Sequence, residues 1–171
     1  LPEKFFLGVA RMIPNKNVPR TLRAFLSFAA KDPEGFSYAN VGAQGPGSPE
    51  VDALLASDPN SSRVRLIPYI DEEDLPAVYA ASFALTSLFH GEGFALPAVE
   101  GMACGTATIL SKNAQPEFSE DDAVMVDVGD EADIERGMRV MATDANARAQ
   151  FASHGLAKAK SAKPTLILLD I

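Results

Sequence analysis

The sequence predicts an α/β domain of the Rossmann-like type, in which helices cover both faces of a mostly parallel sheet. Short apolar runs of strand length alternate along the 171 residues with longer segments that carry helix-start signals. Strands joined through helices in this way lie parallel, and the connecting helices then cover the sheet. The length suits one domain, so we expect residues 1–171 to form a single three-layer unit.

Six apolar runs have the length and composition of buried strands. Parallel strands covered on both faces are typically continuous apolar runs, and these segments fit that pattern. They lie at residues 4–10, 36–42, 64–69, 83–87, 106–110 and 123–127. Ligands of such sheets bind where the carboxyl ends of strands lead into helices. We therefore expect the functional residues in the loops that follow these strands.

Residues that favour a first helical turn stand before the intervening segments. A capping side chain followed by proline or an acidic residue satisfies N–H groups that have no partner inside the helix. The signals are Asn17 before Pro19, Ser48 before Pro49, Asp71 before EEDL, Leu96 before Pro97, Asp130 with Asp133, and Asp144. The last segment, 161–171, is apolar and β-prone beyond Pro164, and the sequence leaves open whether this atypical tail adds a strand or packs otherwise.

The overall charge argues against two classes of partner. The chain carries a formal net charge of −8, whereas nucleic acids and anionic membranes need a basic surface. No apolar run approaches the length of a membrane span. Cys104 is the single cysteine, which favours a reducing, cytoplasmic compartment. The chain opens without methionine, directly in a strand-like segment, which is typical of a piece of a longer protein.

The stretch HGEGFALPAVEGMACG, residues 90–105, carries the strongest functional signal. Pro97 suits a first helical turn and Gly105 a helix end, which places Glu100 one turn inside the helix and Glu92 in the loop before it. Free N–H groups near residues 94–97 form an anion-binding helix end. Amides that bind phosphate beside two carboxylates that accept from hydroxyls suit a nucleotide sugar.

This region resembles the E-x7-E signature of retaining glycosyltransferases of the GT-B fold, family 4. The similarity extends to GVARMIPNKN near the start, YIDEEDLPAVYAAS before the signature and SKNAQPEFSEDDAVMV after it, in the family's order. It implies the C-terminal, donor-binding domain, with the acceptor held mainly by an N-terminal domain that this chain lacks. It also implies that no metal or other cofactor is required.

The resemblance implies a role for each matching residue. Glu92 would accept hydrogen bonds from the transferred sugar, and Glu100 from the ribose hydroxyls. Arg11 and Lys16 would neutralise the diphosphate. The base would lie after the third strand, near Tyr69 and Ile70. Backbone N–H groups would assist the two cations, and these belong to Gly93, Phe94, Ala95 and Leu96.

The sequence departs from the family pattern at several positions. His90 and Gly91 are additional in their loop, Gly101 stands for the usual alanine, and Pro68 stands for a frequent glycine. The ending PTLILLDI replaces an aromatic-rich closing helix. These departures keep open a non-catalytic interaction module of the same fold, and an epimerase-like enzyme acting on nucleotide sugars.

Two further enzyme classes are disfavoured by their missing motifs. GAQGPGS at 42–48 has the glycine spacing of a P-loop without its lysine, and the first strand–helix turn lacks the dinucleotide pattern G-x-G-x-x-G. The sequence leaves open the base, the sugar, the acceptor, the oligomeric state and the role of His90.

Overall fold

The computed structural model describes residues 1–91, 95–112 and 118–161. Within them, six strands form one sheet in the order β3-β2-β1-β4-β5-β6, and each neighbouring pair is parallel. This confirms the predicted α/β class. The strands are β1 (Phe5–Val9), β2 (Ser37–Val41), β3 (Val64–Ile67), β4 (Ala84–Ser87), β5 (Thr108–Ser111) and β6 (Val124–Val126).

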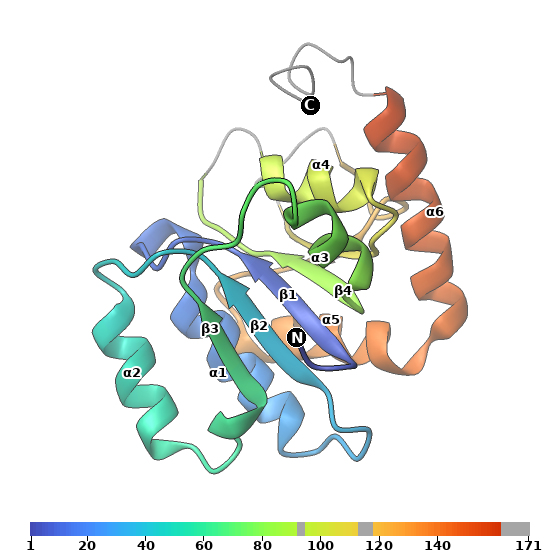
Figure 1. Cartoon of the computed structure of the whole chain (residues 1–171). Coiled ribbons are helices and arrows are strands. Elements are labelled where there is room, and N and C mark those ends of the chain that lie inside the picture. Colours follow the sequence, from blue (N-terminus) through green and yellow to red (C-terminus); the bar gives the residue numbers. More distant parts are fainter. Residues whose placement is uncertain (92–94, 113–117, 162–171) are drawn as a thin grey trace.

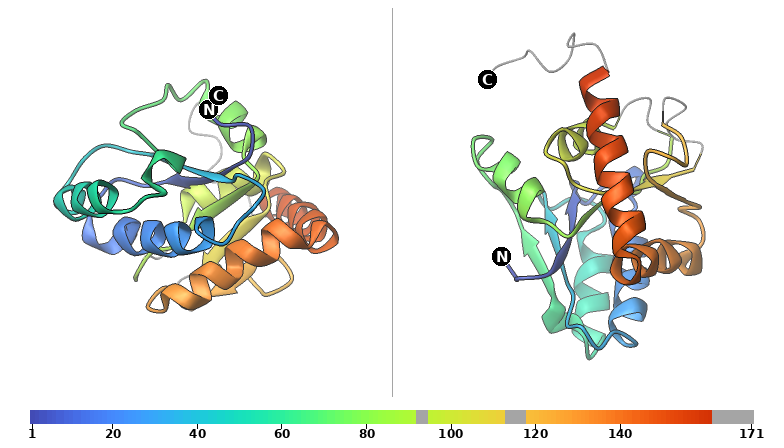
Figure 2. Two further views of the ribbon diagram at one scale, coloured as in Figure 1. Left: turned by 90° about the horizontal axis from the view of Figure 1, so that it is seen from below. Right: turned by 90° about the vertical axis from the view of Figure 1, so that its right-hand side faces the viewer.

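Helices cover both faces of this sheet (Figures 1 and 2). On one face lie α1 (Val18–Ala29), α2 (Ser48–Ser57) and α5 (Glu131–Thr143). The other face carries α3 (Leu75–Ala81) and α4 (Leu96–Ala103), and α6 (Ala145–Ser161) packs along α4 and α5. The short helices η1 (Pro14–Lys16) and η2 (Ser61–Arg63) complete the described elements.

The strand order reverses between β1 and β4. The chain runs outward from β1 to β3 and then returns to place β4 on the other side of β1. Loops that leave β1 and β4 therefore diverge to opposite faces from neighbouring carboxyl ends, which is where ligands of open α/β sheets bind. The predicted Arg11–Lys16 loop and the E-x7-E loop are these two loops.

The α1 and α5 face is packed with aromatic rings. Phe6 of β1 is fully buried and lies 5.4 to 6.4 Å, centroid to centroid, from four other rings. Phe36 and Phe83 make the tightest contact, at 4.6 Å with planes 72° apart. Edge-to-face ring contacts of this kind add to the free energy gained by burial. This cluster fixes α1 against β1, the two elements that the β1 loop connects.

The α3 and α4 face contains no aromatic ring pair among the described residues. Phe5 and Leu7 of β1 meet Val78 and Tyr79 of α3 and Leu85 of β4. Successive residues of a strand point to opposite faces, so Phe5 and Phe6 belong to different cores. Gly101 of α4 sits against this layer, and a Cβ there would lie 2.6 Å from Leu85 Cδ2. A side chain at this position would therefore require Leu85 to shift.

Only part of the predicted helix capping is correct. Asp130 and Asp144 accept from the backbone N–H groups of Ala132 and Ala147, as expected. Ser48 does not cap: its hydroxyl accepts from Gly45 N and donates to Met12 Sδ. The side chains of Asn17 and Asp71 make no cap either, since Asn17 reaches another loop and α3 begins only at Leu75. Ser48 and Asn17 instead direct their side chains to the distant residues Met12 and Val128.

Two other expectations concern the tail and the membrane. Ser161 ends α6, and residues 162–171 of the predicted tail lie outside the described residues. None of the described helices combines the length and the apolar character that crossing a bilayer requires.

Candidate functional site

A groove opens at the carboxyl edge of β1, β2 and β3. It has a volume of about 330 Å³ and brings together residues from three loops that are far apart in the sequence. Arg11 and Lys16 line it from the β1 loop, Tyr69 and Ile70 from the β3 loop, and Leu75 from the start of α3. The structure thus places four of the predicted site residues in one groove.

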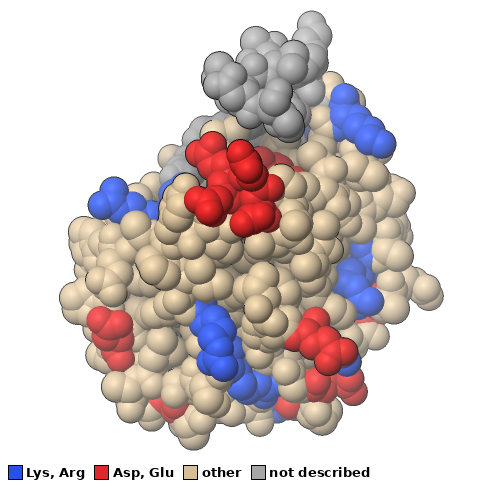
Figure 3. All heavy atoms as spheres, viewed as in Figure 1, with Lys and Arg blue, Asp and Glu red and all other residues tan. Residues whose placement is uncertain are grey.

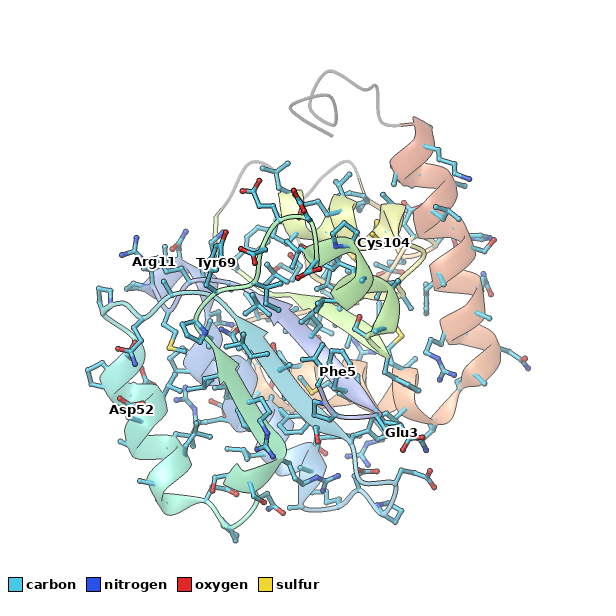
Figure 4. All side chains as sticks on the ribbon, in the orientation of Figure 1. Glu3, Phe5, Arg11, Asp52, Tyr69 and Cys104 are labelled. Atoms are coloured by element: carbon cyan, nitrogen blue, oxygen red, sulfur yellow. The ribbon has the colours of Figure 1, made fainter. Side chains whose placement is uncertain are left out.

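Arg11 lies at the outer rim of this groove. Its side chain is exposed, and its Nε lies 3.5 Å from the carbonyl oxygen of Gln44, a long contact that leaves most of the guanidinium facing solvent. Figure 4 shows Arg11 and Tyr69 at the same edge of the molecule. A planar cation in this position can approach a diphosphate with two parallel N–H donors.

Lys16 lies deeper, at the end of η1. Its Nζ is 5.4 Å from the centroid of the buried Phe89 ring, which belongs to the β4 loop. A cation over a ring face is attracted electrostatically to the ring. The ammonium group of Lys16 therefore lies between the β1 loop and the β4 loop, against the ring of Phe89.

Backbone contacts fix the two loops to each other. His90 N donates to the carbonyl oxygen of Asn15 at 2.8 Å, which ties the β4 loop to η1. Asn17, which follows η1, adopts the left-handed conformation with φ 56°. Its Nδ2 donates to Val128 O at 3.0 Å. Asparagine tolerates this conformation better than most residues. The turn after Lys16 is thus held by a partner that lies 111 residues later in the sequence.

Glu100 projects from α4, and its carboxylate is exposed at one side but held at the other. Tyr79 Oη donates to Glu100 Oε2 at 2.8 Å. Tyr79 is 1% exposed, and its burial together with the negative charge of Glu100 raises the pKa of the phenol well above its ordinary value. The phenol therefore stays protonated and remains a donor at any physiological pH.

The helix α3 links this carboxylate to the groove. Leu75 lines the groove, and Tyr79 lies one turn later on the same side of the helix. Since α3 packs on α4, the position of Glu100 relative to Arg11 and Lys16 is set by contacts between helices and not by the loop alone.

The surface around the groove has both signs of charge. Figure 3 shows a group of acidic side chains at the centre of the upper surface, and cationic side chains at the left edge, where Figure 4 labels Arg11. The β3–α3 loop contributes four exposed acids, Asp71, Glu72, Glu73 and Asp74. An anion is accordingly attracted to the Arg11 side of the groove and repelled from the α3 side.

The start of α4 carries two of the predicted backbone donors. Ala95 is fully buried and precedes the first helical residue, and Leu96 is 43% exposed. Pro97 occupies the first turn, as predicted. The other predicted residues of this loop, Glu92, Gly93 and Phe94, lie outside the described residues.

The described residues contain no group of three or more His, Cys, Asp and Glu side chains that could hold a metal ion. That the site works without a metal or other cofactor remains a prediction. Cys104 follows α4 and is partly buried, and burial raises the pKa of its thiol, as does the nearby charge of Glu100. A thiol in this setting is a packing group and not a ligand.

Comparison with known proteins decides the family. A family model described as "Glycosyl transferases group 1" matches residues 1–157. The chain belongs to this family. It is 31% identical over 163 residues to the serotype-specific mannosyltransferase WbdA of Escherichia coli, and 27% identical over 157 residues to the O-antigen chain mannosyltransferase B of the same organism. These matches cover 92% and 91% of this chain but 20% and 41% of the two relatives.

Solved structures of other proteins show the same fold. The C-terminal domain of a glycosyl transferase group 1 protein (LpcC) from Francisella tularensis superposes with a TM-score of 0.84 at 22% identity, covering 95% of this chain and 87% of that domain. Sucrose-phosphate synthase from Thermosynechococcus elongatus gives 0.80 at 24% identity, covering 94% and 42%. The chain thus has the architecture of one half of a GT-B glycosyltransferase.

Sequence reasoning missed Tyr79 and Phe89, which hold Glu100 and Lys16. Both lie in stretches that resemble the family, but no local pattern assigns a partner to either side chain. Glu100 lies 21 residues after Tyr79, and Lys16 lies 73 residues before Phe89, so only the packed structure reveals these contacts.

Proposed function

We propose that this glycosyltransferase domain binds a nucleoside-diphosphate sugar and supplies the donor half of a retaining hexosyltransferase. Arg11 and Lys16 contact the diphosphate, Glu100 accepts from the ribose hydroxyls, and the base stacks near Tyr69 and Ile70. Glu92 binds the transferred sugar, with backbone N–H groups between Gly93 and Leu96 beside it. An N-terminal domain of the full-length protein holds the acceptor. A cytoplasmic location belongs to this proposal and is supported by the single cysteine.

The groove carries this proposal. It places two cations and an exposed aromatic side chain in one recess, at the carboxyl edge of β1, β2 and β3. Phosphate requires the cations, and a base requires a flat apolar surface such as the ring of Tyr69, which is 69% exposed. The mannosyltransferase relatives support a hexose as the transferred group.

The proposed reaction needs no nucleophile from the protein. The bond between the anomeric carbon and the diphosphate oxygen breaks, and its electron pair leaves with the diphosphate. The acceptor hydroxyl forms the new bond on the same face of the sugar, and its proton passes to the departing diphosphate. Arg11 and Lys16 stabilise the charge that develops on the leaving group, which is the main contribution that fixed cations make to such a step.

Titration with UDP, GDP and ADP, by calorimetry or by NMR, tests the proposal directly. We expect at least one of them to bind, and Arg11→Ala and Glu100→Ala each to weaken its binding by roughly tenfold or more, since each removes a contact to a charged group. The affinity itself will be modest, because half of the cleft is absent from this chain.

Two matched variants control for the loss of a charge. Arg65→Ala removes an exposed arginine of β3 that does not line the groove, and Glu3→Ala removes an exposed acid at the other end of β1 (Figure 4). Both should leave the affinity unchanged. If none of the three nucleotides binds even at millimolar concentration, the interaction-module alternative replaces the enzyme proposal.

A further inference from the structure

The hydrogen bond between Tyr79 and Glu100 joins a core residue to a surface residue. A fully buried phenol donates at 2.8 Å to a carboxylate that is itself exposed. An exposed glutamate of a helix ordinarily samples several rotamers, and fixing them costs conformational entropy when a ligand binds. Here a core residue restrains the carboxylate before any ligand is present.

Tyr79 is itself fixed from several directions. Its carbonyl oxygen accepts from Thr106 Oγ1 at 2.7 Å and from Ser82 Oγ at 2.7 Å. Thr106 is 4% exposed and lies between α4 and β5, so the end of α3 is attached to the segment that follows the helix of Glu100. Tyr79 is therefore held by bonds from the residue after α3 and from the segment after α4.

Gly101 lies against Leu85 and beside the tyrosine ring. A Cβ at this position would lie only 2.6 Å from Leu85 Cδ2, whereas its distance of 3.4 Å from Tyr79 Cδ1 would be ordinary van der Waals contact. The residue next to Glu100 thus lets α4 approach the layer that contains the ring. Gly101 and the Tyr79–Glu100 hydrogen bond therefore lie at the same contact between α3 and α4.

We propose that Tyr79 is a positioning residue for nucleotide binding: its hydroxyl holds the Glu100 carboxylate in the orientation that accepts from the ribose hydroxyls. This inference rests on the proposed function and extends it by naming the residue that pre-organises the ribose contact. An ionised carboxylate has about four acceptor sites, so one bond from Tyr79 leaves acceptors for both hydroxyls of a ribose. Pre-organisation of this kind raises affinity by lowering the cost of ordering the side chain.

Tyr79→Phe tests the inference, because it deletes the hydroxyl and keeps the ring. The probe is whichever of UDP, GDP and ADP binds the wild-type chain, together with its 2′,3′-dideoxy form. We expect Tyr79→Phe to weaken binding of the ribonucleotide by about five- to tenfold and binding of the dideoxy form by less than twofold. The preference for ribose over dideoxyribose should therefore fall, which a general structural defect would not produce.

A double-mutant cycle separates positioning from direct binding. In the Glu100→Ala background, Tyr79→Phe should have no further effect on affinity, because the group that it positions is gone. Tyr38→Phe is the matched control: Tyr38 is also buried, at 2% exposure, but its hydroxyl pairs with Thr86 and not with Glu100. It should lower stability without changing the ribose preference.

The outcomes distinguish this inference from the function on which it rests. If the wild-type chain binds the ribonucleotide and Tyr79→Phe keeps both its affinity and its ribose preference, the positioning role is wrong and the proposed function stands. If the wild-type chain binds no nucleotide, both fall. Equal losses in Tyr79→Phe and Tyr38→Phe would also overturn the positioning role, since they would reflect weakened packing alone.

Discussion

The two faces of the sheet are packed in different ways. The α1 and α5 face holds all the aromatic ring pairs found among the described residues, and ion pairs join its helices, such as Lys31 to Glu135 at 3.0 Å. The α3 and α4 face holds no ring pair among the described residues, and its buried Tyr79 reaches outward to Glu100. One face mainly provides stability, and the other sets the geometry of a side chain at the site.

This difference has a physical basis. Large rings bury much apolar area and tolerate no voids, so a face built from them is rigid and insensitive to what binds at its edge. On the α3 and α4 face, a buried phenol of one helix donates to a carboxylate of the next, so the packing of these helices orients a polar side chain. Substitutions on the two faces should consequently change different measured quantities.

The largest expected effect is on the aromatic face. Phe6→Ala removes a fully buried ring that contacts four others, and should lower the free energy of unfolding by about 3–5 kcal/mol, measured by urea denaturation. Phe6→Leu, which keeps most of the volume, should cost less, about 1–2 kcal/mol. The nucleotide affinity of the molecules that remain folded should not change. A loss of affinity in the leucine variant would show that the two faces are not separable.

A pair of helix glycines compares the faces directly. A Cβ on Gly137 of α5 would meet Val126 Cγ1 at 2.9 Å and Ile109 Cγ2 at 3.1 Å, which are branched side chains with little freedom to move. Gly137→Ala should therefore cost about 2 kcal/mol of unfolding free energy. Gly101→Ala meets the flexible end of Leu85, and the better helix propensity of alanine, worth about 1 kcal/mol, should nearly offset the repacking.

Thermal or urea unfolding of both alanine variants measures this contrast. The ribose preference is the second readout, because the repacking in Gly101→Ala is adjacent to Tyr79. We expect it to change in Gly101→Ala and to stay constant in Gly137→Ala, although Gly137→Ala is the less stable variant. The reverse pattern would contradict the assignment of positioning to the α3 and α4 face.

The smallest expected effect is the pH dependence of the α1–α5 contact. Glu135 is 8% exposed; its burial favours the neutral acid, but hydrogen bonds from Ser27 and Lys31, with the charges of Lys31 and Arg139, hold its pKa below its ordinary value of 4.5. A carboxyl with a depressed pKa in the folded state stabilises the fold above its unfolded-state pKa and loses that contribution as the pH falls through the folded-state value.

Glu135→Gln measures this contribution. At neutral pH the variant should be about 1 kcal/mol less stable than the wild-type chain, because Lys31 and Arg139 lose their charged partner on a partly exposed surface. The difference should shrink as the pH falls below 4.5, where the wild-type carboxyl takes up its proton. A difference that stays constant down to pH 3 would mean that the charge of Glu135 does not contribute.

The sequence predicted most of the fold because burial on both faces leaves a strong local signal. Each of the six apolar runs became a strand, within a few residues of its predicted bounds, and Pro97 and Asp130 stand where first turns begin. The signals that failed, such as Ser48, are polar side chains that found a closer tertiary partner. A capping preference is worth about 1 kcal/mol, which one alternative hydrogen bond can outweigh.

The sequence by itself determined the α/β class, the family resemblance and the residue types that a nucleotide sugar would need. Only the tertiary structure decided that Arg11, Lys16, Tyr69 and Ile70 line one groove, and that Tyr79 holds Glu100. The reason is physical: secondary structure follows from periodicity within a few neighbouring residues, whereas a site at a sheet edge depends on strand order. The reversal between β1 and β4, which no local pattern encodes, brings the loop of residues 10–17 next to residues 88–91.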